Sequence, residues 1–301
     1  MVDRASAFDD REVVELLKTR YVPVAPSLTE LIKSKDPAGD FFRKVVGQRA
    51  EPKHTKQGYY IASPDGTLVV GWMYPRPDDG TMKKNLAEAL KTYRPPKQID
   101  RIDASKVDRQ CNPVPPDGAA VIEVCSKVLD AKWGPSPAKR VDMIRDAVGR
   151  DRLWILRAER EALLRGELAD SLLERVIRFH LVDNTRGVPR RWKQEEMKAV
   201  ELKLAKGTLQ GRVQLDGFDV QLYGRIEAKG GALSRFDVVA RGVHDPKKTE
   251  VGEVPLAPYT VAIAFALSES GEPARVPPLF SWDLPDYLRT AALRVTELRR
   301  K

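Results

Sequence analysis

The sequence predicts a mixed α+β (or α/β) protein of two domains, in which helices surround a β-hairpin first and an antiparallel meander follows. Helical patterns flank the hairpin stretch 55–72. From Met197 onward apolar and polar residues alternate, which is typical of strands with one buried face. Prolines bracket the polar segment between these patterns and make it stiff. We therefore predict a first domain at 1–95, a linker at 96–118 and a β-meander domain with flanking helices at 119–301.

The composition is that of a folded protein with a charged surface. The chain has 301 residues, 42% of them hydrophobic and 32% charged, which is long enough for two domains of ~100–200 residues each. No apolar run approaches the ~18–20 residues of a membrane helix, so no membrane span is expected. The N-terminal stretch MVDRASAFDDRE lacks the apolar core of a signal peptide. The cytoplasm is therefore the default expectation, with a secreted mature form as the alternative.

The chain is basic, with 52 Lys and Arg residues against 43 Asp and Glu residues and a net charge of +9. Basic proteins attract nucleic acids through counterion release. Here the excess charge is scattered, and the densest basic runs, 189–193 and 298–301, are short. A generally basic solvated surface is therefore favoured over a nucleic-acid groove.

Capping signals and one strand signal organise the first domain. The aspartates at 9–10 can cap a helix, residues 27–30 have the capping-box spacing, and Asp36-Pro37 is typical of a cap followed by a first-turn proline. The stretch Tyr21–Val24 is rich in β-formers but contains a proline, which predicts an edge strand or a bent strand. We expect helices at 12–19, 28–33, 37–47 and 82–93.

A β-hairpin lies at the centre of this domain. The apolar runs Tyr59–Ile61 and Leu68–Val70 are separated by Ser63-Pro64-Asp65-Gly66. Proline presets φ for a turn and glycine accepts a positive φ. This stretch is therefore predicted to fold as two strands joined by a tight turn.

The order helix, strand, helices, hairpin, helix resembles the thioredoxin fold, and GYYIASPDGTLV is similar to the hairpin of thioredoxin-like proteins. The resemblance covers roughly Asp9 to Tyr93. Active members carry CxxC after the first central strand, where this chain has Ala25-Pro26-Ser27-Leu28, and a cis-proline where it has Gln57-Gly58. Disulfide exchange needs a thiolate and a resolving thiol. The resemblance therefore implies a redox-inactive domain that serves to dock a protein or peptide partner.

Over its whole length the chain resembles bacterial proteins that join a thioredoxin-like N-terminal domain to a β-rich C-terminal domain. Three stretches carry this resemblance: TKQGYYIASPDG, RFHLVDNTRG with the following Trp192, and RFDVVARG. The group implies no settled activity.

The second domain combines strands, hairpins and a few helices. Asp216-Gly217 and Gly230-Gly231 lie between alternating runs and predict two hairpin turns. We expect further strands at 120–129, 152–157 and 260–267, and helices at 158–164, from 171 to before 180, and from 287 to 295.

Metal and cofactor signatures are missing from the sequence. Cys111 and Cys125 do not form CxxC, and two thiols cannot build a Cys₄ or Cys₃His zinc site. Two unpaired thiols are favoured over a single disulfide. The sequence has no HExxH, GxSxG, GxxxxGK[ST] or GxGxxG. We therefore expect no cofactor and no metal site.

Two clusters remain as candidate binding sites. His180, Asp183, Asn184 and Arg186 follow a predicted helix end, which would bring their polar groups together as an acid/base or metal cluster. The favoured alternative is that His180 completes an apolar stripe while Asp183 and Asn184 satisfy the helix end and turn.

Trp192 lies among three basic residues and could stack a base beside phosphates, although packing at a loop edge is the favoured interpretation. The remaining histidines, His54 and His244, are expected in an exposed loop and at a hairpin tip.

Three functions are consistent with these patterns. The favoured one is a non-catalytic binding or scaffold protein with an unidentified protein or peptide partner. The second is an enzyme of unknown class with a site near His180, Asp183 and Arg186. The third is a nucleic-acid-binding protein, motivated by the charge and by Trp192 with its basic neighbours.

Overall fold

The structure is a computed structural model that describes residues 10–24, 28–49, 56–72, 80–99, 103–106, 108, 113–130, 148–185, 190–245, 258–268 and 276–299. The chain divides into two compact units, Val2–Pro113 and Val114–Lys301. Each unit has its own secondary structure and its own core, and we describe them separately.

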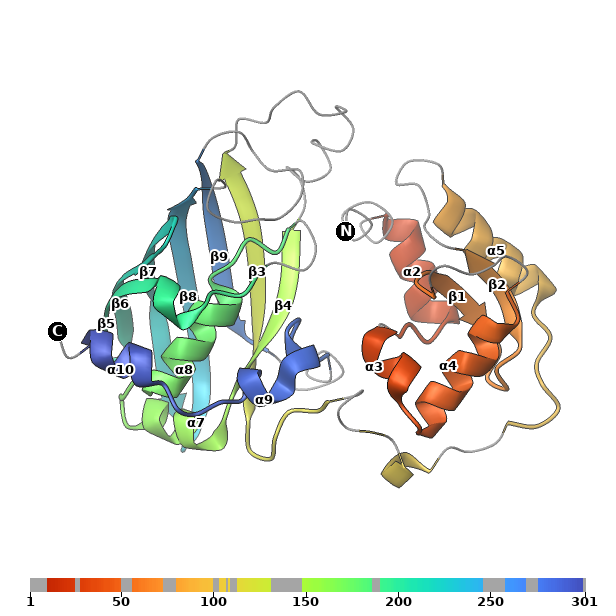
Figure 1. Ribbon diagram of the computed structural model, residues 1–301, viewed down its shortest axis with the longest axis horizontal. Helices are drawn as coiled ribbons and strands as arrows, with labels where there is room; N and C mark the ends of the chain where they lie inside the picture. Colours follow the sequence, from red (N-terminus) through yellow and green to blue (C-terminus); the bar gives the residue numbers. More distant parts are fainter. Residues whose placement is uncertain are drawn as a thin grey trace. The chain divides into compact units, whose positions relative to one another are not determined.

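The N-terminal unit contains helices around a two-stranded antiparallel sheet (Figure 1). Asp10 caps the first helix by accepting a hydrogen bond from the backbone N–H of Glu12 at 2.8 Å. Asp36 caps another in the same way through Gly39, also at 2.8 Å, with Pro37 in its first turn. The elements are α2 Arg11–Arg20, α3 Leu28–Lys33, α4 Pro37–Gly47, β1 Tyr59–Ala62, β2 Leu68–Trp72, α5 Thr81–Thr92 and the 3₁₀ turn Ala104–Lys106.

A small core holds the N-terminal unit together. Val13 of α2 packs with Met82 and Leu86 of α5, and Ile61 of β1 lies against this cluster. The turn between β1 and β2 places Gly66 at φ 83°, a conformation that favours glycine. The predicted hairpin and the predicted apolar stripe of α5 are therefore both present.

The segment Tyr21–Val24 is not a strand, so that prediction is wrong. Val22 and Val24 are 89% and 77% exposed, and Pro23 has no N–H for a sheet ladder. The segment is held instead by a side chain, because the Tyr21 hydroxyl donates a hydrogen bond to the carbonyl of Leu86.

The C-terminal unit is built on an antiparallel sheet of seven strands in the order β4-β3-β9-β8-β7-β6-β5. The turn at Gly217 joins β6 to β7, and the turn at Gly230 and Gly231 joins β7 to β8, as the sequence predicts. The strands are β3 Ala120–Asp130, β4 Val148–Ile155, β5 Met197–Ala205, β6 Thr208–Leu215, β7 Phe218–Lys229, β8 Ala232–His244 and β9 Tyr259–Leu267.

The helices of this unit lie on one face of the sheet (Figure 1). Helix α7 contacts β7 and β8, and α10 contacts β5. The helical elements are α7 Arg157–Leu164, α8 Asp170–Arg175, a π-helical turn at Val176–His180, α9 Leu284–Tyr287, α10 Leu293–Arg299 and two 3₁₀ turns at Gln194–Glu196 and Ser281–Asp283.

The predicted C-terminal helix is divided in two. Tyr287, at the end of α9, packs with Trp154 and Phe179, whereas Ala292 and Val295 pack in the main core of the sheet. One straight helix cannot place both halves of its apolar stripe in two separate clusters. The chain therefore leaves the helical path between α9 and α10.

The prediction of a mixed α+β protein with antiparallel sheet is confirmed. In the stretches that the structure describes, no helix combines the length and the apolar character needed to cross a bilayer.

The close pairing of β7 and β8 should make Gly242 intolerant of a side chain. A Cβ at this position would lie 2.2 Å from the backbone carbonyl oxygen of Asp219, and backbone cannot move aside cheaply. We expect Gly242→Val to lower the free energy of unfolding by about 3 kcal/mol, as overpacking does. Urea denaturation followed by tryptophan fluorescence measures this. The control Ala266→Val, on the exposed face of β9, should change stability by less than about 0.5 kcal/mol.

Candidate functional site

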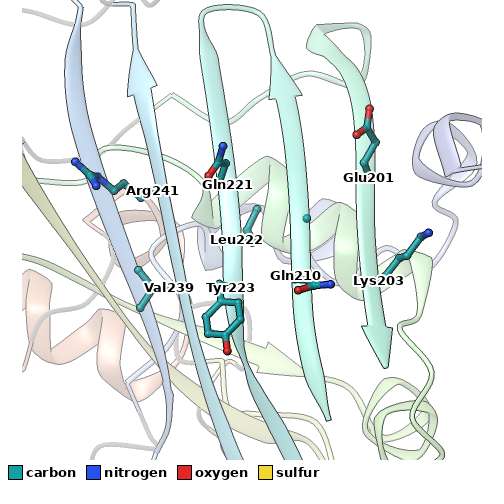
Figure 2. A pocket seen from close by; sticks show the side chains of 9 residues that line it. Glu201, Lys203, Gln210, Gln221, Leu222, Tyr223, Val239 and Arg241 are labelled. Carbon is teal, nitrogen blue, oxygen red and sulfur yellow. The ribbon is translucent and has the colours of Figure 1, made fainter. Parts of the chain in front are cut away.

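The face of the sheet away from the helices carries a shallow hollow of 740 Å³ (Figure 2). We call this side of the sheet the open face. Period-two alternation places polar or small side chains here and apolar side chains under the helices. Figure 2 shows side chains that line the hollow on four neighbouring strands. The lining residues are Glu201, Lys203, Gln210, Gly211, Gln221, Leu222, Tyr223, Val239 and Arg241.

A row of apolar side chains crosses the middle of the open face. Tyr223 pairs with Val239, Val239 pairs with Ala264, and Ala264 pairs with Cys125, so the four residues lie side by side on β7, β8, β9 and β3. Tyr223 is 63% exposed and Val239 is 51% exposed. A cysteine thiol behaves as a small apolar group in such a setting. We call these four residues the apolar row.

Charged residues lie on both sides of the apolar row. On β8, Arg241 lies two residues after Val239 and Asp237 two residues before it. On β3, Lys127 and Glu123 lie in the same positions relative to Cys125. Several of these charges are paired within the chain, including Asp237 with Arg235 at 2.6 Å. On β8 and β3 the apolar row thus has a basic residue on one side and an acidic residue on the other. Arginines also lie on the acidic side, where Arg225 pairs with Asp237 across the strands and Arg152 is 3.3 Å from Glu123.

The described strands of the open face carry a cysteine but no histidine on this face, because His180 and His244 are both buried. Cys125 is a free thiol. The side chains that line the hollow offer apolar contact, hydrogen bonds and charges of both signs.

His180 lies in a closed polar cluster under the sheet. It ends the π-helical turn and is buried, with Nε2 2.9 Å from the hydroxyl of Tyr287 and Nδ1 3.1 Å from Oδ2 of Asp151. The Tyr287 hydroxyl also accepts a hydrogen bond from the backbone N–H of Trp154 at 3.3 Å. Burial, reinforced by the Asp151 carboxylate, raises the pKa of Tyr287 far above its usual value. The phenol therefore stays protonated and acts as a structural hydrogen-bonding group.

The other predicted site residues have separate partners. Asp183 accepts a hydrogen bond from the hydroxyl of Thr185 at 2.6 Å and another from Tyr259 at 2.8 Å. Asn184 accepts one from the hydroxyl of Ser126. Arg186 lies outside the described residues. Asp183 and Asn184 therefore bond to groups other than the partners of His180, although the three are close in sequence.

Trp192 is buried in the core. Its indole N–H donates to the carbonyl of Leu181 at 2.7 Å, and its ring stacks on Phe218 with the centroids 6.4 Å apart. The Trp192 ring also packs edge-on with the ring of His244, with the centroids 6.3 Å apart. A ring enclosed in this way offers no face to a nucleic-acid base.

His244 is not at a hairpin tip, so that prediction is wrong. It is the last residue of β8, and the alternation that begins at Phe236 turns its side chain inward. The imidazole packs between the rings of Phe218 and Tyr259, with centroid distances of 5.3 and 5.2 Å. His54 lies outside the described residues.

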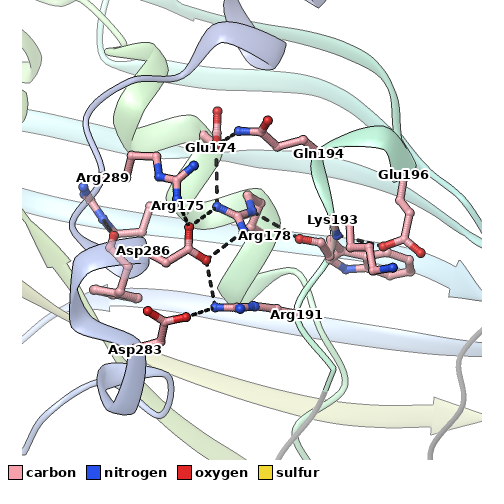
Figure 3. A network of polar contacts seen from close by, with 12 residues as sticks. Glu174, Arg175, Arg178, Arg191, Lys193, Gln194, Glu196, Asp283, Asp286 and Arg289 are labelled. Carbon is pink, nitrogen blue, oxygen red and sulfur yellow. Dashed lines mark hydrogen bonds and ion pairs between the residues drawn. The ribbon is translucent and has the colours of Figure 1, made fainter.

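An ion-pair network joins the π-helical turn, the segment around Arg191 and the segment of Asp283 and α9 (Figure 3). Arg178 of the π-helical turn makes a two-pronged contact with Asp286 of α9, at 3.0 and 2.9 Å. Asp286 also contacts Arg191 at 2.8 Å and Arg289 at 3.1 Å. Arg191 in turn reaches Asp283 at 2.6 Å.

The charge balance of this network fixes the ionisation of Asp286. Burial acts to raise the pKa of Asp286, but hydrogen bonds from Arg178 and the charges of Arg178, Arg191 and Arg289 outweigh it and hold the pKa below its usual value. The carboxylate already occupies the space between the guanidinium groups. The network therefore fastens α9 to the rest of the unit and is not an anion-binding site.

Metal ligands do not converge in the part of the chain that the structure covers: no three His, Cys, Asp or Glu side chains gather as a metal ion would require. Comparison with protein families, with curated proteins and with solved structures finds no match for this chain.

Sequence reasoning missed Asp151, Arg178, Asp286 and Tyr287. The contacts Asp151–His180, Arg178–Asp286 and Tyr287–His180 join positions more than 25 residues apart, and no motif marks such pairs. One local signal existed, because Glu174 and Arg178 have the i,i+4 spacing of a helical ion pair and lie 3.7 Å apart.

If the His180 cluster is structural, removal of one hydroxyl should reduce stability. Tyr287→Phe leaves Nε2 of His180 and the N–H of Trp154 without their shared partner inside the core. We expect the free energy of unfolding to fall by about 2 kcal/mol. Tyr223→Phe removes an exposed hydroxyl and is the matched control, with an expected change below about 0.5 kcal/mol. Equal stability of the two variants in urea denaturation would contradict the structural role.

The Asp286 network should make stability depend on acidic pH. Because the pKa of Asp286 is lower in the folded chain than in the unfolded chain, its contribution is present above the unfolded value of about 3.9 and is lost as pH falls through the folded pKa. We expect Asp286→Asn to cost about 3 kcal/mol at pH 7, because three arginines lose their shared carboxylate. This difference from wild type should shrink as pH falls below about 4.

The control for this experiment is Asp219→Asn. Asp219 pairs with Arg212 on the open face, and its side chain is 46% exposed. Exposed pairs contribute little, so the cost should be below about 1 kcal/mol. Chemical denaturation at pH 7 and pH 3 measures both variants, and a constant difference between Asp286→Asn and wild type at the two pH values would be evidence against the expected ionisation.

Proposed function

We propose that this chain is a non-catalytic binding or scaffold protein whose interaction surface is the open face of the C-terminal sheet. The observation that carries the proposal is the apolar row, an exposed strip across four central strands of a large sheet. The hollow beside it is broad and shallow, which suits a macromolecular surface better than a small enclosed substrate.

The character of the open face supports this use. Exposed apolar patches with polar margins mark interaction sites in soluble proteins. Tyr223 supplies a rigid aromatic side chain, and aromatic residues and arginine are enriched in interfaces. Val239 and Ala264 continue the apolar strip without blocking close approach. The charged margins would exclude partners of the wrong charge pattern.

The state of the polar candidates supports a non-catalytic function. His180 and Asp183 are buried and bonded to side chains of the core. A general acid or base must reach its substrate within hydrogen-bonding distance, directly or through one water. Neither group reaches the surface, so the enzyme hypothesis has less support. The nucleic-acid hypothesis loses its stacking residue, because Trp192 is buried.

In this proposal the N-terminal unit is a redox-inactive thioredoxin-like domain that adds a second docking module. Its support is the order β1, β2, α5, which corresponds to the β-β-α second half of that fold, and the absence of any cysteine from residues 1–110 of the sequence. Without a thiolate this unit has no means of disulfide exchange.

A photo-crosslinker at Val239 tests the proposed surface. A benzophenone amino acid at this position of the full-length protein should form covalent adducts with macromolecules in an extract of the cells that naturally express the protein. The matched control places the same group at Glu161, an exposed residue of α7. Adducts at position 239 should exceed those at position 161 by at least about tenfold. Equal yields at both positions would refute the open face as the interaction surface.

A further inference from the structure

We propose that the occupant of the open face is a second copy of this chain, with the two sheets packed face to face about a two-fold axis that runs along the apolar row. The inference rests on the proposed function, because it uses the same surface and names its partner. Its basis is the arrangement of charges on β8 and β3, where a basic residue on one side of the row and an acidic residue on the other exchange places under that rotation.

The strand register fixes what a two-fold axis along the apolar row would bring together. Rotation about this axis reverses each strand direction and leaves each strand opposite its own copy. A residue two positions after the row then faces the residue two positions before the row on the same strand of the second copy. Tyr223, Val239, Ala264 and Cys125 meet their own counterparts at the centre.

Opposite charges meet under this rotation. On β8, Arg241 follows Val239 by two residues and Asp237 precedes it by two, so each Arg241 faces Asp237 of the other copy. On β3, Lys127 and Glu123 stand in the same relation to Cys125. The two strands therefore bring four pairs of opposite charges together in the dimer. Asp237 would share its carboxylate with Arg235 of its own chain, and Glu123 with Arg152.

The other two strands of the row, β9 and β7, fit the same axis. On β9, Ala262 faces Ala266 of the second copy, so the backbones can approach closely there. On β7, Gln221 faces Arg225, an acceptor opposite a donor. Like charges would meet at Lys203 on β5 and Arg150 on β4, which face their own copies, and on β7, where Asp219 faces Glu227. Packed sheets cross at about 30°, which separates the outer strands β5 and β4 from their copies and keeps the central strands in contact.

The available area matches that of stable complexes. Strands lie ~4.8 Å apart and rise ~3.4 Å per residue, so four strands of nine residues present roughly 600 Å² and seven present roughly 1,000 Å². Two copies would bury roughly 1,200–2,000 Å² in total, the usual size of a specific protein interface.

Charge reversal on β8 tests the inference with the full-length protein. We expect wild type to form a dimer in sedimentation velocity runs over a range of concentrations. Asp237→Arg and Arg241→Asp should each weaken dimerisation by at least about tenfold, because like charges then face each other across the interface. The double variant Asp237→Arg/Arg241→Asp restores the opposite charges and should return the dimer Kd to within about threefold of wild type. Both residues are exposed, and circular dichroism with thermal unfolding shows whether each variant is folded.

A short bifunctional maleimide gives a second measurement. Packed sheets lie ~10 Å apart, which is too far for a disulfide but suitable for such a linker between the two Cys125 thiols. In a Cys111→Ser background we expect a covalent dimer, and the further change Cys125→Ser should abolish it.

Two results would overturn the inference. The first is a monomeric wild type at all concentrations, and the second is a dimer whose Kd neither charge reversal changes. If the wild type is monomeric while the crosslinker at Val239 still captures another macromolecule, the proposed function stands and the second copy is wrong as its partner. If the crosslinker captures nothing above the control at Glu161, the proposed function fails as well.

Discussion

The C-terminal unit depends on one constraint: from β5 to β9 the antiparallel strands bury a single face, and on β3 and β4 only Val121 and Trp154 are buried on the opposite side. Along β7 and β8 the side chains alternate strictly, so Phe236, Val238 and Ala240 all lie under the helices while their neighbours lie outside. Burial of this face supplies the core, at roughly 25 cal/mol per Å² of apolar surface. The same alternation creates the other face, because each inward position has an outward neighbour. The fold and the candidate interaction surface therefore have one origin.

Local patterns allowed much of this architecture to be predicted. Turn glycines at 217, 230 and 231 and the period-two runs around them locate the hairpins, because both signals act within a few residues. Prediction failed where distant packing decided the outcome. The segment Tyr21–Val24 has strand-forming residues, but the hydroxyl of Tyr21 donates a hydrogen bond to the carbonyl of Leu86 in α5. The last helix divides because its two halves pack in different clusters. The burial of His244 could have been predicted, because continuing the alternation of Phe236, Val238 and Ala240 along β8 places His244 on the buried face.

The candidate site was harder to predict, and the reason is geometric. The apolar row consists of four residues on four strands, and only the register of those strands makes them neighbours. A sequence gives the face on which Val239 lies but not the residue opposite to it. The same limit applies to Asp151 and Tyr287, which meet His180 from segments 29 residues before it and 107 after it. The proximity of His180 and Asp183 in sequence suggested a shared site, and the structure gives them different partners.

The buried polar groups also fix the positions of the elements in this interior. A buried ion pair such as Arg178 and Asp286 gains electrostatic attraction but loses the hydration of both charges. The two free energies largely cancel, so the pair adds little net stability. It does impose geometry, because a two-pronged contact allows one orientation of α9 against the π-helical turn. With α9 held there, Tyr287 reaches His180 and covers it. The network that fixes α9 thus helps to remove the His180–Asp151 pair from solvent. The open face stays exposed, and it is the surface that we propose for contact with another molecule.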